Sequence, residues 1–299
     1  MTIESWQNPE SPWWAKLRRA RKHITELRLM IDDFERRRPW SITAEVGPGT
    51  NELAYRLRIL QPVPSDLITA VGDAIHNMRS ALDSAAFELA RRHLKGSMNS
   101  AHEALSEFPI KRSAEQFEKF FDGKRRLEGV AFVRRDMYSE AGVRALRCVQ
   151  PFALSEEAAA LGVEWSRDSE TEYRYHFLGR LHALSVIDKH RRLPALTWTA
   201  DLMYWSDVPE GQSYGWRPAQ GLTEFADGAL IGHFVNVGGI TPPELHPNWA
   251  MHLTFDDDPG GRTSNFADTL GNWCRSIESW TIPRMAVVAE GNPPPLGFF

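Results

Sequence analysis

The sequence has 299 residues, of which 42% are hydrophobic and 25% are charged, and its formal net charge is −4. This composition is typical of a globular protein, and a negative net charge argues against a protein that coats nucleic acid nonspecifically. No apolar run approaches the roughly 20 residues needed to span a bilayer. The first residues, MTIESWQNPESPWW, also lack the charged and apolar regions of a secretory signal. We therefore expect a cytoplasmic protein that has no membrane partner.

The first predicted helix covers residues 11–38. Its apolar residues recur at helical spacing from Trp13 to Phe34, and Ser11 and Pro12 are suited to its cap and first turn. The stretch KLRRARK makes this helix basic. Such a run is usually a solvated helix face, and contact with RNA is the alternative.

A β-hairpin and a second helix follow. The stretches WSITAEV and LAYRLRIL alternate apolar and polar residues on either side of GPGTN, which predicts two paired strands joined by a turn. The second helix is predicted over residues 65–95, with Ser65 as its cap and Gly96 at its end. One face of this helix is apolar, and its residues are Val71, Ile75, Met78, Leu82 and Leu89.

The second half of the chain contains two more long helices and a β-rich segment. Residues 97–168 are weakly periodic and predict short helices and connections. A third long helix is predicted over residues 170–192, because Pro194 disfavours helical geometry in the residue before it. Residues 195–258 contain three β-rich stretches separated by turn residues, which predict an antiparallel sheet. A fourth helix is predicted over residues 264–287, with an apolar side made by Phe266, Leu270, Trp273 and Ile277.

These elements predict an α+β fold in which residues 1–299 form a single domain. Its helical core is a bundle of about four long helices. The bundle carries the hairpin, and the antiparallel sheet is inserted between the third and fourth helices. The two cysteines, Cys148 and Cys274, have no paired spacing, so we expect reduced and buried thiols.

Three residues of the second helix fall on one line along the edge of its apolar face: His76, Arg79 and Asp83. Asp188 interrupts the apolar face of the third helix, and His23 lies similarly in the first. Burial of an unpaired charge costs several kcal/mol, and the planar guanidinium of Arg79 can bind the carboxylate of Asp83 or Asp188. We therefore expect the second and third helices to be neighbours that share a buried His/Arg/Asp network without chemical activity.

Two stretches carry a resemblance to known proteins. GDAIHNMRSALD and the later DKHRRL resemble a family of uncharacterised bacterial proteins, frequent in actinobacteria, with the pattern G-D-x-x-H-N-L-R-S-A-L-D-H and a later D-K-H-R. The resemblance covers mainly the second and third helices and implies no activity.

In its R-S-A-L-D-H form, the pattern is also similar to the Arg-x4–6-His signature of HEPN ribonucleases, helical-bundle proteins that cleave RNA without a metal. In that reaction the 2′-hydroxyl of the RNA attacks, so an imidazole and a guanidinium near the phosphate suffice. The resemblance places Arg79 at the arginine position. Ser84 occupies the histidine position, so catalysis would depend on His76 or His190, or the chain would be an inactive relative.

A metal site is a third interpretation. His76 and Asp83 are two turns apart, and Asp188, His190 or His23 would complete a mixed set of nitrogen and oxygen ligands. Neither His-Glu-x-x-His nor Glu-x-x-His occurs in the sequence, so no common helical metal motif supports this interpretation.

The leading prediction is a non-catalytic intracellular protein with a polar network and a partner-binding surface, and the alternative is a HEPN-like ribonuclease. No metal or other cofactor is predicted. The partner would be an unidentified protein or RNA, and a second copy of the chain is a further candidate. The candidate site residues are His76, Arg79, Asp83, Asp188 and His190.

Overall fold

A computed structural model describes most of the chain, and the described residues are 6, 8–46, 52–95, 97–127, 130–189, 196–206, 215–218, 227–235, 246–255 and 266–295. The chain forms two compact units. The first, here called the helical unit, consists of Met1–Ile24, Val71–Arg192 and Leu270–Phe299. The second, the sheet unit, consists of Thr25–Ala70 and Leu193–Thr269. The predicted hairpin, residues 40–60, therefore belongs to the same unit as the β-rich segment. That residues 1–299 form a single domain stays a prediction.

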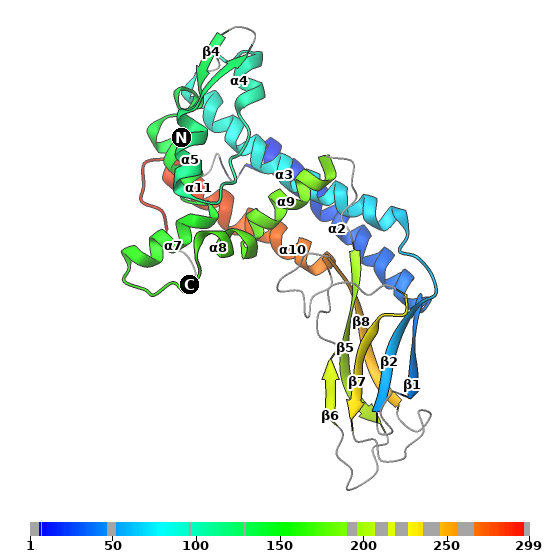
Figure 1. Cartoon of the computed structure of the whole chain (residues 1–299). Helices are drawn as coiled ribbons and strands as arrows, with labels where there is room; N and C mark the ends of the chain where they lie inside the picture. Colours follow the sequence, from blue (N-terminus) through cyan, green and yellow to red (C-terminus); the bar gives the residue numbers. More distant parts are fainter. Residues whose placement is uncertain are drawn as a thin grey trace. The chain divides into compact units, whose positions relative to one another are not determined.

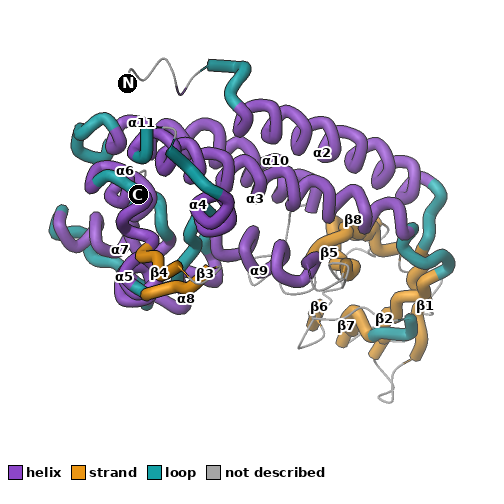
Figure 2. Tube along the Cα trace, turned by 90° about the horizontal axis from the view of Figure 1, so that it is seen from above, coloured by secondary structure: helices purple, strands orange, loops and turns teal. Residues whose placement is uncertain are grey.

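Three long helices lie side by side in both views of the chain (Figures 1 and 2). They are α2 (Pro12–Arg36), α3 (Ser65–His93) and α10 (Phe266–Ser276). Each was predicted, and the apolar residues predicted to line α2 and α3 are buried. Burial of such a stripe is the main stabilisation of an amphipathic helix.

The shorter elements of the helical unit follow α3 in the chain. They are α4 (Ser100–Leu105), α5 (Ala114–Asp122), β3 (Lys124–Leu127), β4 (Val130–Val133), η1 (Arg134–Met137), α6 (Glu140–Arg147) and α7 (Pro151–Ala160). The predicted short helices are present, and the antiparallel pair β3–β4 was not predicted.

The predicted third helix is two helices, α8 (Ser169–Tyr175) and α9 (Phe177–Lys189), so the prediction of one continuous helix was wrong. His176 between them has an extended conformation, with φ −70° and ψ 134°. Its ring Nδ1 accepts the N–H of Leu178 at 3.2 Å, which caps the start of α9. A Cβ atom on Gly179 would lie 1.9 Å from the carbonyl oxygen of Tyr173, so only glycine permits this close approach.

The last helical region is continuous but irregular. After α10, a π-helical turn covers Ile277–Thr281, and α11 covers Ile282–Ala289. Pro283, near the start of α11, has no N–H to donate and cannot sit in a regular helix interior without disturbing it. The wider π turn before it accommodates this break in the hydrogen-bond ladder.

The sheet unit contains two antiparallel sheets in its described residues. The first has the strand order β1-β2-β7-β6 and the second pairs β5 with β8. Their bounds are β1 (Trp40–Val46), β2 (Glu52–Ile59), β5 (Leu196–Ser206), β6 (Gly215–Pro218), β7 (Leu230–Val235) and β8 (His246–Phe255). The predicted hairpin is β1–β2, and the predicted α+β class is confirmed. No helix in the described part of the chain combines the length and apolar character needed to cross a membrane.

Candidate functional site

Arg79 and Asp83, one helical turn apart on α3, bind the backbone of the same residue. The Nη2 of Arg79 donates to the carbonyl oxygen of Phe108 at 2.5 Å and lies 3.1 Å from Asp83 Oδ1. Asp83 Oδ1 also accepts the N–H of Phe108 at 2.9 Å. Arg79 is 7% exposed, and the Phe108 side chain is fully buried. We call this arrangement the Arg79–Asp83 clamp.

Two other side chains hold the end of α4 and the segment that connects it with α5, residues 106–113. Arg134 Nε donates to the carbonyl oxygen of Leu105 at 3.2 Å, and its guanidinium lies 4.1 Å from the ring centroid of Phe120. The fully buried Gln150 donates to the carbonyl oxygen of Pro109 at 2.8 Å and accepts the N–H of Lys111 at 3.0 Å. Irregular buried backbone needs such partners, because a lost hydrogen bond there costs free energy.

The other predicted site residues do not join this network among the described residues. His76 is exposed, and its Nε2 lies 3.5 Å from the hydroxyl oxygen of Ser80. Asp188 belongs to α9, but its side chain is outside the described part, as is all of His190. The expected pairing of Arg79 with a carboxylate is present with Asp83, and the pairing with Asp188 stays a prediction.

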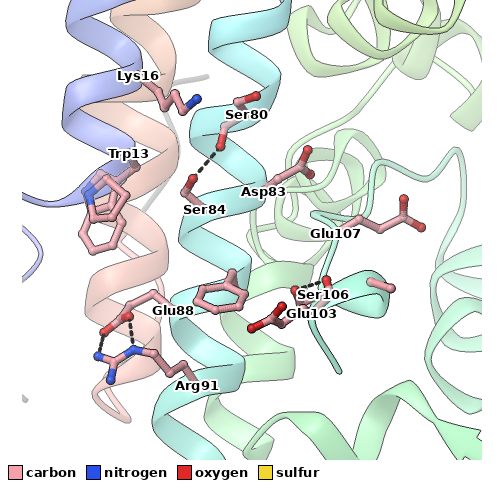
Figure 3. A pocket seen from close by; sticks show the side chains of 13 residues that line it. Trp13, Lys16, Ser80, Asp83, Ser84, Glu88, Arg91, Glu103, Ser106 and Glu107 are labelled. Carbon is pink, nitrogen blue, oxygen red and sulfur yellow. Dashed lines mark hydrogen bonds and ion pairs between the residues drawn. The ribbon is translucent and has the colours of Figure 1, made fainter. Parts of the chain in front are cut away.

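A groove of about 650 Å³ lies beside the clamp (Figure 3). One wall is α2, another is α3, and the third is α4 with the residues that follow it. The half-buried Phe87 gives it apolar surface, whereas Trp13 at its wall is buried. The lining residues are Pro12, Trp13, Lys16, Ser80, Asp83, Ser84, Phe87, Glu88, Arg91, Glu103, Ala104, Ser106 and Glu107.

Carboxylates outnumber cations along the groove, because Asp83, Glu88, Glu103 and Glu107 accompany only Lys16 and Arg91. Glu88 is held by Arg91 at 2.7 Å and by Arg92 at 2.5 Å. Burial opposes ionisation of Glu88, but the hydrogen bonds from these two arginines outweigh it and lower the pKa of its carboxyl. Glu103 and Glu107 are exposed, and Figure 3 shows them on the wall opposite α2.

Ser84, which the expected resemblance to HEPN ribonucleases places at their histidine position, lines the groove. Its hydroxyl donates to the carbonyl oxygen of Ser80 at 2.8 Å, one turn earlier in α3. A serine hydroxyl is not a base near neutral pH. No histidine is among the described residues that line the groove.

Two tyrosines near the clamp are kept in their neutral form. Burial raises the pKa of Tyr138, although the Arg134 cation opposes this effect. Burial also raises the pKa of Tyr173 on α8, against the cations of Arg112 and Arg79. Both phenols are therefore protonated at neutral pH and are unsuited to act as nucleophiles.

Among the described residues, no three His, Cys, Asp or Glu side chains lie close enough together to hold a metal ion. These residues therefore provide no ligand set for the metal interpretation. Asp83 is engaged by Arg79 and by the Phe108 backbone. His23, a further candidate ligand, accepts the Nε–H of Arg19 at 3.1 Å.

Comparison of the chain with protein-family models, with curated proteins and with solved structures found no match. The resemblances to the bacterial family and to HEPN proteins therefore stay expectations. The site has to be interpreted from its own geometry.

The sequence did not point to Arg134, Gln150 or the Phe108 backbone. One signal was present, because Phe108 precedes Pro109 and a residue before proline is held in an extended conformation. An extended stretch among helices cannot pair its own backbone groups, so partners from side chains had to exist. Their identity depends on contacts between residues 25 to 41 positions apart, which no local pattern shows.

Proposed function

We propose that the chain is a non-catalytic binding protein whose groove receives a cationic segment of a protein partner. The observation that carries the proposal is the Arg79–Asp83 clamp. The guanidinium that would act on a phosphate, that of Arg79, is bonded instead to the Phe108 carbonyl and to Asp83. A guanidinium that is 7% exposed and holds a buried carbonyl is poorly placed to receive RNA.

The charge of the groove supports the same proposal. RNA binding depends on cations that neutralise phosphates. The exposed carboxylate of Glu103 would repel phosphates and attract the side chains of lysine or arginine, and Glu107, which Arg134 contacts at 3.4 Å, adds to this more weakly. The apolar surface of the half-buried Phe87 would accommodate an apolar side chain of the same partner, as is common at the centre of protein interfaces.

The two cysteines fit a reducing compartment, and we propose the cytoplasm as the location. Cys148 and Cys274 are both free thiols. Burial raises the pKa of Cys148 to about 11, so this thiol is unreactive at neutral pH.

Peptide binding tests the proposal. A fluorescent peptide of leucine and arginine should bind, and a matched peptide with glutamate in place of arginine should not. Glu103→Lys should weaken binding at least about fivefold, since an attractive charge becomes repulsive. Glu164→Lys, which changes an exposed carboxylate outside the groove, is the matched control and should bind as the parent does.

Fluorescence anisotropy at low and high salt measures this effect, which salt should reduce. Equal binding of both peptides would contradict the proposed partner. Metal-independent cleavage of a labelled RNA that is lost in His76→Ala would instead favour the ribonuclease alternative.

A further inference from the structure

Strand β1 forms one edge of the four-stranded sheet. Within the described residues it pairs only with β2, so its other side has no strand partner there. Natural edge strands usually carry lysine, proline or a bulge that prevents further pairing. The seven residues of β1, WSITAEV, contain neither lysine nor proline, and the register with β2 is regular throughout.

The register determines which backbone groups of β1 point outward. Leu60, which follows β2, donates its N–H to the carbonyl oxygen of Pro39. Pro39, the residue before β1, therefore directs its carbonyl group toward β2. Leu57 of β2 lies opposite Ile42, but it donates its N–H to the carbonyl oxygen of Ala229, on the β7 side and away from β1. Because bonded and non-bonded pairs alternate in an antiparallel ladder, four residues of β1 direct their N–H and C=O groups away from β2, and they are Trp40, Ile42, Ala44 and Val46.

We propose that a second copy of the chain pairs with this edge, antiparallel and around a two-fold axis at Thr43. In this register Trp40 lies opposite the partner's Val46, and Ile42 lies opposite the partner's Ala44. These are the residues whose backbone groups point outward, so each pair can exchange two hydrogen bonds. The two four-stranded sheets would then form one continuous sheet, a self-complementary interface of the commonest symmetry.

Side chains agree with the same register. Val46 is 68% exposed, and Trp40 of the other copy would cover it. Glu45 is the one charged residue of β1, and the register places it opposite the partner's Ser41 instead of opposite a second glutamate. Glu45 would also lie near the start of β1 in the other copy, which follows Arg36, Arg37 and Arg38 in the chain. Opposite charges would therefore approach each other.

A single pair of seven-residue strands makes a small interface. Interfaces of this size are typical of weak and reversible association, so we expect a dissociation constant on the order of 10 to 100 μM. The dimer uses only the sheet unit and does not depend on the proposed groove partner.

Cysteine cross-linking tests the two-fold register. Thr43 faces β2 in a hydrogen-bonded pair, so across the axis the two Thr43 residues form a non-bonded pair with Cα atoms about 4.5 Å apart. This distance suits a disulfide. Thr43→Cys should give a disulfide-linked dimer on mild oxidation, whereas Ser41→Cys and Val46→Cys, which face other residues, should not.

A proline variant tests the edge without a new bond. Ala44→Pro removes an N–H that points away from β2, so the internal ladder is retained and the dimer should be lost. Thr43→Pro is the comparison, because it removes a bond to β2 and should lower the melting temperature.

Analytical ultracentrifugation from about 1 to 200 μM, spanning the expected constant, measures the association. A monomer at every concentration, together with no cross-link in Thr43→Cys, would overturn the proposal. A dimer that Ala44→Pro leaves unchanged would overturn it as well, and circular dichroism would show that this variant is folded.

Discussion

The backbone hydrogen-bonding groups of the helical unit and of the sheet unit find their partners in different ways. In the helical unit three buried arginines each donate to a backbone carbonyl at the end of a helix or beyond it: Arg79 to Phe108, Arg134 to Leu105 and Arg284 to Cys148. In the sheet unit the described backbone is paired mainly by strand ladders, and Arg56, which donates to the Gly228 carbonyl oxygen, is 39% exposed. A few side chains should therefore govern the stability of the helical unit, whereas the ladder governs the sheet unit.

The largest predicted effect is that of Arg79→Ala. The substitution removes the partner of the Phe108 carbonyl and of the Asp83 carboxylate, so we expect a loss of about 3 kcal/mol in the free energy of unfolding. Urea unfolding measures it. Arg91→Ala is the matched control on the same helix, since Arg91 is exposed and Glu88 keeps its bond to Arg92. The control should cost less than about 1 kcal/mol.

Gln150→Ala should have the next largest effect. It leaves the carbonyl oxygen of Pro109 and the N–H of Lys111 without their partner, and both lie in the segment that Arg79 and Arg134 also hold. We expect a loss of about 2 kcal/mol, measured in the same way. An unchanged stability would mean that the connecting segment relaxes and finds other partners.

Acid should destabilise the helical unit through His176. Burial lowers the pKa of this imidazole to about 3, whereas the unfolded chain has its ordinary value of 6.5. The unfolded state therefore binds more protons below pH 6.5, and stability falls as the pH falls. From pH 6.5 to 5.5 His176 should contribute a loss of about 1 kcal/mol. His176→Asn keeps a capping acceptor but cannot titrate, so its melting temperature should depend less on pH in this range.

Glu35 should give the sheet unit the opposite response. Burial, with a smaller contribution from Asp32, raises the pKa of the Glu35 carboxyl from 4.5 to about 7. The folded state then binds the additional proton, so stability is lost as the pH rises from 4.5 to 7. After allowance for solvent screening we expect less than about 1 kcal/mol. Glu35→Gln should remove this loss, and melting curves at pH 5 and pH 8 measure it; a steeper dependence in the variant would contradict the assignment.

The long elements could be predicted because their patterns are local. The helices predicted over 11–38 and 65–95 are α2, Pro12–Arg36, and α3, Ser65–His93. Both have long apolar stripes and clear start signals. The β1–β2 hairpin was equally evident, because its strands alternate on either side of a glycine-rich turn.

The break at His176 and most of the clamp could not be predicted. No proline or glycine precedes the break, and the reason for Gly179 is a contact with the Tyr173 carbonyl that exists only in three dimensions. The line of Arg79 and Asp83 was visible as a periodicity, and their pairing was one of two predicted options. The sequence could not show that both side chains bind Phe108. They bind its backbone N–H and C=O, and almost every residue has these groups.

The most direct test of the central claim is a double-mutant cycle of Arg79→Ala and Asp83→Ala, measured by urea unfolding. If the two side chains act together on Phe108, each single variant should be destabilised, and the double variant should lose at least about 1 kcal/mol less than the sum of the two losses. Single variants as stable as the parent, or strictly additive losses, would contradict the clamp and return Arg79 to the list of candidate catalytic residues.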